Sequence, residues 1–224
     1  MSQNDIAQNI HRLRTELPQS VKLVAVSKFH PVEAIQAAYN AGQRIFGESR
    51  VAELNAKIDA LPSDVQWHFI GHLQTNKVKS VIGRVSLIES IDSQRLLDLV
   101  DSLSEKAGVI TRVLMQVHIA AEDTKFGWTP GELMDYFRER RFKNLKATHL
   151  CGLMGMATNT DNTERIEADF ATLGRLHRQI LEITPDLRGF DEISMGMSDD
   201  YRIAIRHGST MVRIGSDIFG VRQY

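Results

Sequence analysis

The stretch Val21-Lys22-Leu23-Val24-Ala25-Val26-Ser27-Lys28 is an apolar run that ends in a lysine, and Phe29-His30-Pro31 follow at once. Its length and its β-branched residues predict a buried strand that leads into a helix. A buried strand should not end in an ammonium group unless water, an anion or a covalent partner receives it. Strand ends that face a helix are also where α/β proteins collect their chemistry. We therefore expect Lys28 to be solvated at a rim, paired with a phosphate, or used as a nucleophile.

The same pattern of apolar run, turn and amphipathic helix recurs along the chain. The helical spacing of Ile6, Ile10, Leu13 and Leu17 predicts a leading helix with one apolar face. The strands are predicted at 21–27, 44–47, 66–70, 86–89, 110–117, 147–153, 192–195 and 210–214. Strand–helix units in succession imply parallel strands with right-handed crossovers. This predicts an α/β fold with one domain over residues 1–224, a (β/α)₈ TIM barrel preceded by a helix. A doubly wound open sheet is the rival, but no Gly-x-Gly-x-x-Gly follows any of the strands.

The composition limits the classes of partner that we expect for this chain. The 224 residues include 27 basic and 28 acidic ones, so net charge gives no reason to expect a nucleic-acid partner. No stretch approaches the roughly 18 consecutive apolar residues of a membrane span, so no membrane partner is expected. Cys151 is the single cysteine, which excludes an internal disulfide framework and fits a cytoplasmic location. A closed barrel without an exposed hydrophobic repeat predicts a monomer.

Candidate site residues gather at the predicted strand ends. Gly215 and Ser216 follow the last strand and Ser194 lies at the end of the seventh, the rim where TIM barrels often bind phosphate. Arg213 alternates with its neighbours so that it points into the barrel, where a guanidinium needs a partner. The first and eighth strands are adjacent in a closed barrel. We call Ser194, Gly215 and Ser216 the phosphate cup. Lys28, Arg213 and this cup should therefore lie close together.

Pyridoxal phosphate (PLP) fits this combination. Its aldehyde can form a Schiff base with Lys28, its phosphate can fill the cup, and Arg213 can donate to the pyridine nitrogen. An arginine there keeps that nitrogen unprotonated, because two cations would otherwise face each other, and this weakens the ring as an electron sink.

Several blocks of sequence closely resemble the pyridoxal phosphate homeostasis protein family, the YggS-like proteins, and they cover nearly the whole chain. They are Ala25-Val26-Ser27-Lys28, Phe46-Gly47-Glu48, residues 67–77 from Trp67 to Lys77, Ser90-Ile91-Asp92, Gly152-Leu153-Met154, residues 194–200 from Ser194 to Asp200, and residues 208–215 from Gly208 to Gly215.

The resemblance implies a barrel like the N-terminal domain of alanine racemase, with PLP held as an internal aldimine on Lys28. It also implies phosphate contacts from Ser194 and from Gly215 and Ser216, and Arg213 at the pyridine nitrogen. Met195 is a further candidate, for contact with the cofactor ring. The family often has asparagine where this chain has Ser49, so a cofactor contact from that position is in doubt.

Three functions remain open. The favoured one is a non-enzymatic carrier that keeps PLP available, with PLP-dependent apo-enzymes as acceptors. The second is a PLP-dependent amino-acid racemase, which needs another acid or base across the cofactor. Of the four tyrosines Tyr39, Tyr136, Tyr201 and Tyr224, Tyr201 is the open candidate for that group, and the chain ends soon after the barrel. The third is a phosphosugar aldolase that uses Lys28. No metal site is expected from the i, i+4 pair His68 and His72, because a strand ends between them.

Overall fold

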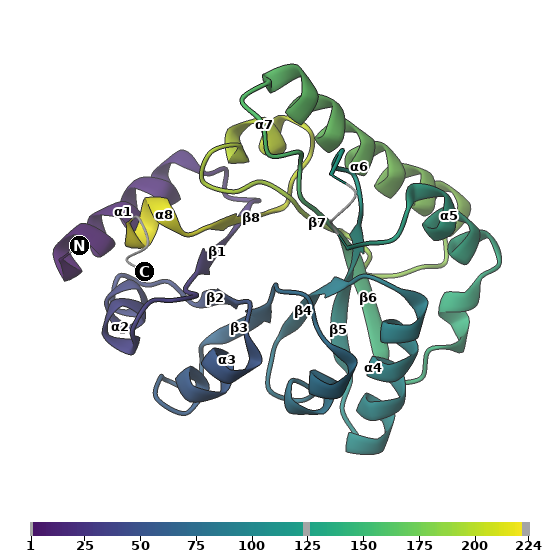
Figure 1. Cartoon of the computed structure of the whole chain (residues 1–224), viewed down its shortest axis with the longest axis horizontal. Helices are drawn as coiled ribbons and strands as arrows, with labels where there is room; N and C mark the ends of the chain where they lie inside the picture. Colours follow the sequence, from purple (N-terminus) through teal and green to yellow (C-terminus); the bar gives the residue numbers. More distant parts are fainter. Residues whose placement is uncertain (1, 123–125, 221–224) are drawn as a thin grey trace.

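The computed structural model describes residues 2–122 and 126–220, and its strands form a closed parallel barrel in the order β1 to β8 (Figure 1). The strands are β1 (Lys22–Val26), β2 (Ile45–Glu48), β3 (Gln66–Phe69), β4 (Leu87–Ile91), β5 (Thr111–Val117), β6 (Thr148–Gly155), β7 (Glu192–Ser194) and β8 (Met211–Ile214). The predicted (β/α)₈ barrel is confirmed. The ring closes between β1 and β8, where Val24 pairs with Arg213.

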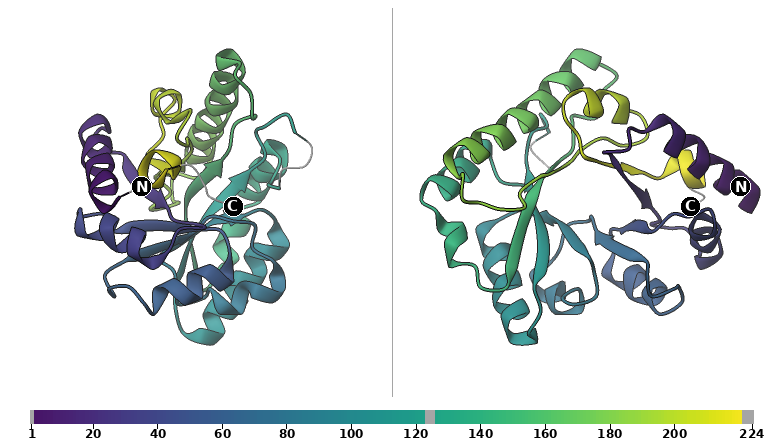
Figure 2. Two further views of the ribbon diagram at one scale, coloured as in Figure 1. Left: turned by 60° about the vertical axis from the view of Figure 1, so that its left-hand side comes forward. Right: turned by 180° about the vertical axis from the view of Figure 1, so that it is seen from behind.

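Helices form an outer layer around the strands (Figures 1 and 2). They are α1 (Gln3–Glu16), α2 (Val32–Asn40), α3 (Val51–Ile58), α4 (Gln94–Ala107), α5 (Pro130–Arg138), α6 (Thr163–Ile183), α7 (Tyr201–Arg206) and α8 (Ser216–Phe219), with the short 3-10 helices η1 (Thr75–Ser80) and η2 (Arg141–Asn144). The predicted apolar face of α1 is buried, and the helix packs against α2 and α8. None of the helices in the described ranges combines the length and apolar character needed to cross a membrane.

Element bounds differ from the predicted ones by a few residues. β1 ends at Val26, because Ser27 and Lys28 already belong to the turn in which Phe29 has a positive φ of 68°. β6 continues past the predicted end at Leu153 to Gly155. Helix α8 was not predicted, since it has only four residues. Each of these differences lies at a strand end beside the candidate site.

Buried side chains form two layers. One lies between strands and helices, and a smaller one fills the barrel interior with Val24, Leu87, Leu114, Cys151, Met154 and Met211. Burying such a side chain contributes about 1.5–3 kcal/mol. Because strand side chains alternate between faces, the inner set identifies which residues further along each strand also point inward. These inward positions lead directly to the candidate site.

Candidate functional site

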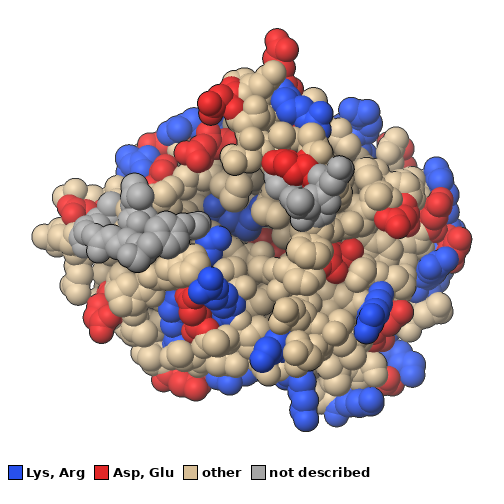
Figure 3. All heavy atoms as spheres, in the orientation of Figure 1, with Lys and Arg blue, Asp and Glu red and all other residues tan. Residues whose placement is uncertain are grey.

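A pocket of about 500 Å³ opens at the carboxyl ends of the strands. Figure 3 shows a hollow near the centre of the molecule, with Lys or Arg atoms inside it. The pocket is lined by side chains and backbone from strand ends and from the segments that follow them: Val26, Lys28, His30, Ser49, Ile70, Gly71, His72, Gln116, Phe126, Met156, Met197, Ser198, Asp199, Arg213, Gly215, Ser216 and Gly220. Of the predicted site residues, Lys28, Arg213, Gly215 and Ser216 are therefore brought together.

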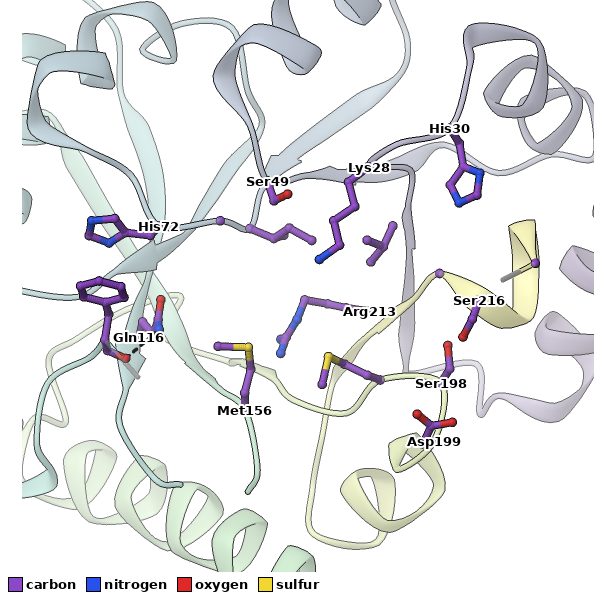
Figure 4. Close-up of a pocket in the computed structure, with 17 residues that line it drawn as sticks. Lys28, His30, Ser49, His72, Gln116, Met156, Ser198, Asp199, Arg213 and Ser216 are labelled. Atoms are coloured by element: carbon purple, nitrogen blue, oxygen red, sulfur yellow. Dashed lines mark hydrogen bonds between the residues drawn. The ribbon is translucent and has the colours of Figure 1, made fainter. Parts of the chain in front are cut away.

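Lys28 reaches the pocket because of strand alternation. Val24 belongs to the inner layer and Val26 lines the pocket, so Lys28, two residues further on, has the same direction. Arg213 comes from the adjacent strand β8, where it pairs in register with Val24. In Figure 4 the side chains of Lys28 and Arg213 extend into the same space. The expected convergence of an amine and a guanidinium is thus present in the structure.

Arg213 is held from below by a buried polar chain. Its Nη1 donates to Ser194 Oγ at 2.5 Å, and its Nη2 donates to the carbonyl of Gly155 at 3.0 Å. The Ser194 hydroxyl in turn donates to Glu89 Oε2 at 2.6 Å, and the other oxygen of Glu89 lies 2.7 Å from His68 Nδ1. Ser194, Glu89, His68 and Arg213 are all buried.

The charges within this buried hydrogen-bonded network balance one another. Burial alone would raise the pKa of the Glu89 carboxyl, but the His68 hydrogen bond, together with the nearby charges, outweighs it and leaves the pKa below its usual value. Burial lowers the pKa of the Arg213 guanidinium, and the negative charges of Glu89 and Asp200 oppose that effect. Arg213 is therefore presented to the pocket as a cation with a fixed counter-charge beneath it.

Two predicted site residues are placed elsewhere. Ser194 is fully buried inside the barrel between Arg213 and Glu89 and does not line the pocket. Met195 alternates with it and packs in the outer layer between strands and helices. The turn at Gly196, with φ of 97°, then brings Met197 and Ser198 to the pocket wall. This part of the pocket wall is therefore formed by the residues after the turn, and a ligand contact from Ser194 or Met195 stays a prediction.

One end of the pocket is polar and built from β8 and its neighbours. Ser216, Ser198 and Asp199 lie together there in Figure 4. Gly215 precedes α8, and a Cβ added to it would lie 3.3 Å from the carbonyl oxygen of Val26, so the backbones are close. The first amides of a helix have no partner within it. This end therefore offers hydroxyls and amides, with the exposed Asp199 as its carboxylate.

The opposite wall holds groups that the sequence analysis did not assign to the ligand site. His72 Nδ1 lies 2.9 Å from Asp92 Oδ2, and its ring stacks on Phe126 with centroids 4.0 Å apart. Gln116 donates to the carbonyl of Phe126 at 2.8 Å. His72 lies at the pocket wall, whereas His68 lies in the barrel interior. Within the described residues, no group of three or more His, Cys, Asp or Glu side chains could hold a metal ion.

Comparison with known proteins gives the same picture. Residues 1–223 match the family model described as alanine racemase, N-terminal domain. The pyridoxal phosphate homeostasis protein of Schizosaccharomyces pombe is 40% identical over 220 residues, which is 94% of this chain and 90% of that protein. The chain belongs to the pyridoxal phosphate homeostasis protein family.

Solved structures extend this result. PipY of Synechococcus elongatus PCC7942, solved with PLP bound, is 35% identical with a TM-score of 0.87, over 96% of this chain and all of that one. Alanine racemase from E. faecalis gives a TM-score of 0.75 at 16% identity, over 99% of this chain and 59% of the racemase, a likeness of fold alone. The pyridoxal phosphate homeostasis protein family thus shares its barrel with the racemase N-terminal domain.

The three tyrosines in the described part of the chain do not line the pocket. Tyr201 donates to Glu16 on α1 at 2.7 Å, and Tyr39 donates to Asp64 at 2.7 Å. Tyr136 is buried in the aromatic cluster of α5, and burial raises the pKa of its hydroxyl. Tyr224, like the rest of residues 221–224, lies outside the described residues. Ser49, by contrast, lines the pocket near Lys28 (Figure 4).

Proposed function

We propose that this chain binds PLP covalently through Lys28 and serves intracellular PLP homeostasis as a carrier, without catalytic turnover. Relatives that align over nearly the whole chain are named for PLP homeostasis, and the related PipY structure has PLP bound. The observation that carries the proposal is the meeting of Lys28 and Arg213 in one pocket that has Gly215 and Ser216 at its polar end. The whole chain, residues 1–224, would form this one ligand-binding domain.

The donor set fits a phosphorylated aldehyde. PLP supplies a carbonyl carbon that condenses with a primary amine and releases one water. Lys28 is the amine on the pocket wall, while Gly215, Ser216 and Ser198 offer amides and hydroxyls that suit phosphate oxygens. Arg213 would face the pyridine nitrogen. A pocket of about 500 Å³ lies within the usual range for small-molecule sites.

The braced guanidinium favours a carrier over a racemase. A cation at the pyridine nitrogen disfavours its protonation, which weakens the ring as an electron sink. Glu89 and Ser194 hold Arg213 in place, so the guanidinium cannot easily withdraw. In the described part of the chain, no tyrosine lines the pocket to act as the second acid or base.

The absorption spectrum of the purified protein tests PLP binding. The wild type is expected to show visible absorption from bound PLP after reconstitution, and Lys28→Ala is expected to lose it. Lys106→Ala, on the exposed surface of α4, is the matched control and should keep it. A wild-type protein that is colourless after incubation with excess PLP and removal of the unbound cofactor would sink the proposal.

A separate experiment tests the absence of turnover. PLP-loaded protein is incubated with single L-amino acids in deuterium oxide, and deuterium at the α-carbon and the D-enantiomer are measured. We expect neither above the level given by free PLP. Turnover of any amino acid that Lys28→Ala abolishes would show that the chain is an enzyme.

The pocket rim bears on how the cofactor could leave. Phe126 and Met197, which line the pocket, are 54% and 41% exposed. Exposed apolar groups at a binding-site rim suit a protein partner, and we propose apo forms of PLP-dependent enzymes as acceptors. Transfer from loaded protein to such an apo-enzyme, in the presence of an agent that traps free PLP, would support direct delivery.

We further propose a cytoplasmic monomer, and light scattering of the purified protein would test the oligomeric state.

A further inference from the structure

The backbone around Lys28 is held on both sides by one helix. The carbonyl of Ser27 accepts a hydrogen bond from Lys57 Nζ at 2.9 Å, and the amide of Phe29 donates to Glu53 Oε2 at 2.8 Å. Lys57 and Glu53 both belong to α3, one helical turn apart. The residues immediately before and after Lys28 are therefore anchored to the same rigid element.

A buried carboxylate completes this arrangement. Glu48, at the end of β2, accepts from Lys57 Nζ at 2.7 Å and from the hydroxyl of Ser27 at 2.6 Å, both through Oε1. Lys57 Nζ is also 3.3 Å from Glu53 Oε2, so one ammonium group joins both carboxylates. We call Glu48, Glu53 and Lys57 the Lys28 clamp. None of the three lines the pocket.

The clamp is not optimised for stability. Glu48 is fully buried, Lys57 is 6% exposed, and the second carboxylate oxygen of Glu48, Oε2, has no hydrogen-bond partner among the described residues. Buried ion pairs are weak evidence for stability, because desolvation offsets their attraction, and an unsatisfied buried oxygen adds to the cost. Such an arrangement calls for another role, and its contacts converge on the residues next to Lys28.

The conformation held by the clamp is unfavourable on its own. Phe29 has a φ of 68°, in the left-handed region, and of the described non-glycine residues Arg140 alone shares this property. A phenylalanine adopts this conformation only when its surroundings impose it. The hydrogen bond from its amide to Glu53 and the Arg50 guanidinium, 4.6 Å from its ring centroid, supply that constraint. Strain of this kind is typical of functional sites.

We propose that Glu48, Glu53 and Lys57 are positioning residues that fix the backbone of Lys28, so that its amine meets the aldehyde of an incoming PLP in one orientation. The proposal rests on the proposed function and adds the residues that prepare the amine for capture. Pre-organising a nucleophile removes the entropic cost of ordering it during the reaction. The clamp thus acts through Lys28 and does not itself touch the ligand.

Loading kinetics test the clamp. Glu53→Ala removes the Phe29 anchor at a partly exposed position, and the double variant Glu48→Gln with Lys57→Met removes both buried charges together, which a fold tolerates better than removing one. PLP is added to cofactor-free protein, and the visible absorption is followed in time. We expect both variants to load at least tenfold more slowly than the wild type. After borohydride reduction, mass spectrometry should find a smaller share of the attached cofactor on Lys28 relative to other lysines.

Asp101→Ala is the matched control for loss of stability alone. Asp101 is 8% exposed and accepts from the amides of Lys146 and Ala147, which precede β6 at the end of the barrel away from the pocket. Its thermal midpoint should fall while its loading rate and site of attachment match the wild type. Clamp variants that are folded and behave like this control would overturn the proposal. A wild type that does not load PLP would instead refute the proposed function, so the two failures are distinguishable.

Discussion

Glu89 and Arg213 face each other across the barrel interior, with Oε2 and Nη1 3.7 Å apart and the Ser194 hydroxyl bridging them. Glu89 lies on β4 and Arg213 on β8, on different sides of the ring. The position of the guanidinium in the pocket is therefore set by the opposite wall of the barrel. A change at Glu89, which does not line the pocket, should reach the ligand through this contact.

Replacing Glu89 by glutamine keeps the shape and removes the counter-charge of Arg213. Leaving one partner of a buried ion pair uncompensated costs about 3 kcal/mol, so we expect a loss of this size in the free energy of unfolding. PLP affinity should fall as well, because Arg213 loses its fixed position. Urea unfolding and PLP titration measure the two effects. Glu105→Gln, at an exposed ion pair, is the control and should change stability by less than about 1 kcal/mol. Equal behaviour of the two variants would contradict this account of the pocket.

Gly71 sets the width of the pocket between β2 and β3. A Cβ at this position would lie 2.2 Å from the backbone oxygen of Ser49, so Gly71→Ala must displace the chain at the pocket wall. We expect a loss of about 1–3 kcal/mol in stability and weaker PLP binding. Gly131→Ala is the control, because a Cβ there meets nothing within 4 Å. Calorimetry and PLP titration of both proteins decide the matter, and unchanged PLP affinity in Gly71→Ala would show that this wall is not used.

Alternation along strands is why the central part of the site could be predicted from the sequence. Lys28, in the turn after β1, keeps the two-residue spacing of Val24 and Val26, and Arg213 follows Met211 on β8. Both are local patterns, and the closed strand order makes the two strands neighbours. The turn at Gly215 is equally local. Together these features were enough to place an amine, a cation and a polar end in one pocket.

The features that the sequence did not reveal depend on contacts between residues that are far apart along the chain. The contact between Glu89 and Ser194 joins residues 105 positions apart through the barrel interior, and no sequence pattern encodes it. Ser194 was assigned to the ligand because it ends a strand, yet the turn at Gly196 makes Met197 and Ser198 the pocket residues. Lys57 looks like an ordinary helix lysine in the sequence. Its burial against Glu48 follows only from how α3 packs on β2.

Substitutions at Ser194 and Ser216 should distinguish a residue that supports Arg213 from a residue that contacts the ligand. Ser194→Ala removes the hydroxyl between Arg213 and Glu89, so we expect a loss of about 1–3 kcal/mol in stability. Ser216→Ala, at an exposed position on the pocket wall, should change stability by less than about 0.5 kcal/mol. Its effect should appear as reduced preference for PLP over pyridoxal, which lacks the phosphate. Titrations with both ligands measure this preference. A Ser194→Ala protein of normal stability that has lost the preference would instead place the phosphate at Ser194.

Glu16 links α1 to α7 and should make stability depend on acid pH. Tyr201 donates to its carboxylate at 2.7 Å, and with Arg12 and Arg202 this lowers the pKa of Glu16 from 4.5 to about 2. Because the folded-state pKa lies below the unfolded one, the unfolded chain binds more protons between these values. The contribution is therefore complete above pH 4.5 and is lost as pH falls toward 2. Since a third of the Glu16 side chain is exposed, solvent screening limits this contribution to about 1 kcal/mol.

We expect Glu16→Gln to lose this amount of stability at neutral pH and to show a flatter acid dependence of unfolding in urea titrations. Glu33→Gln, at an exposed position on α2, should follow the wild type. An acid dependence in Glu16→Gln as steep as that of the wild type would mean that other carboxyls, and not the Tyr201 contact, control this range.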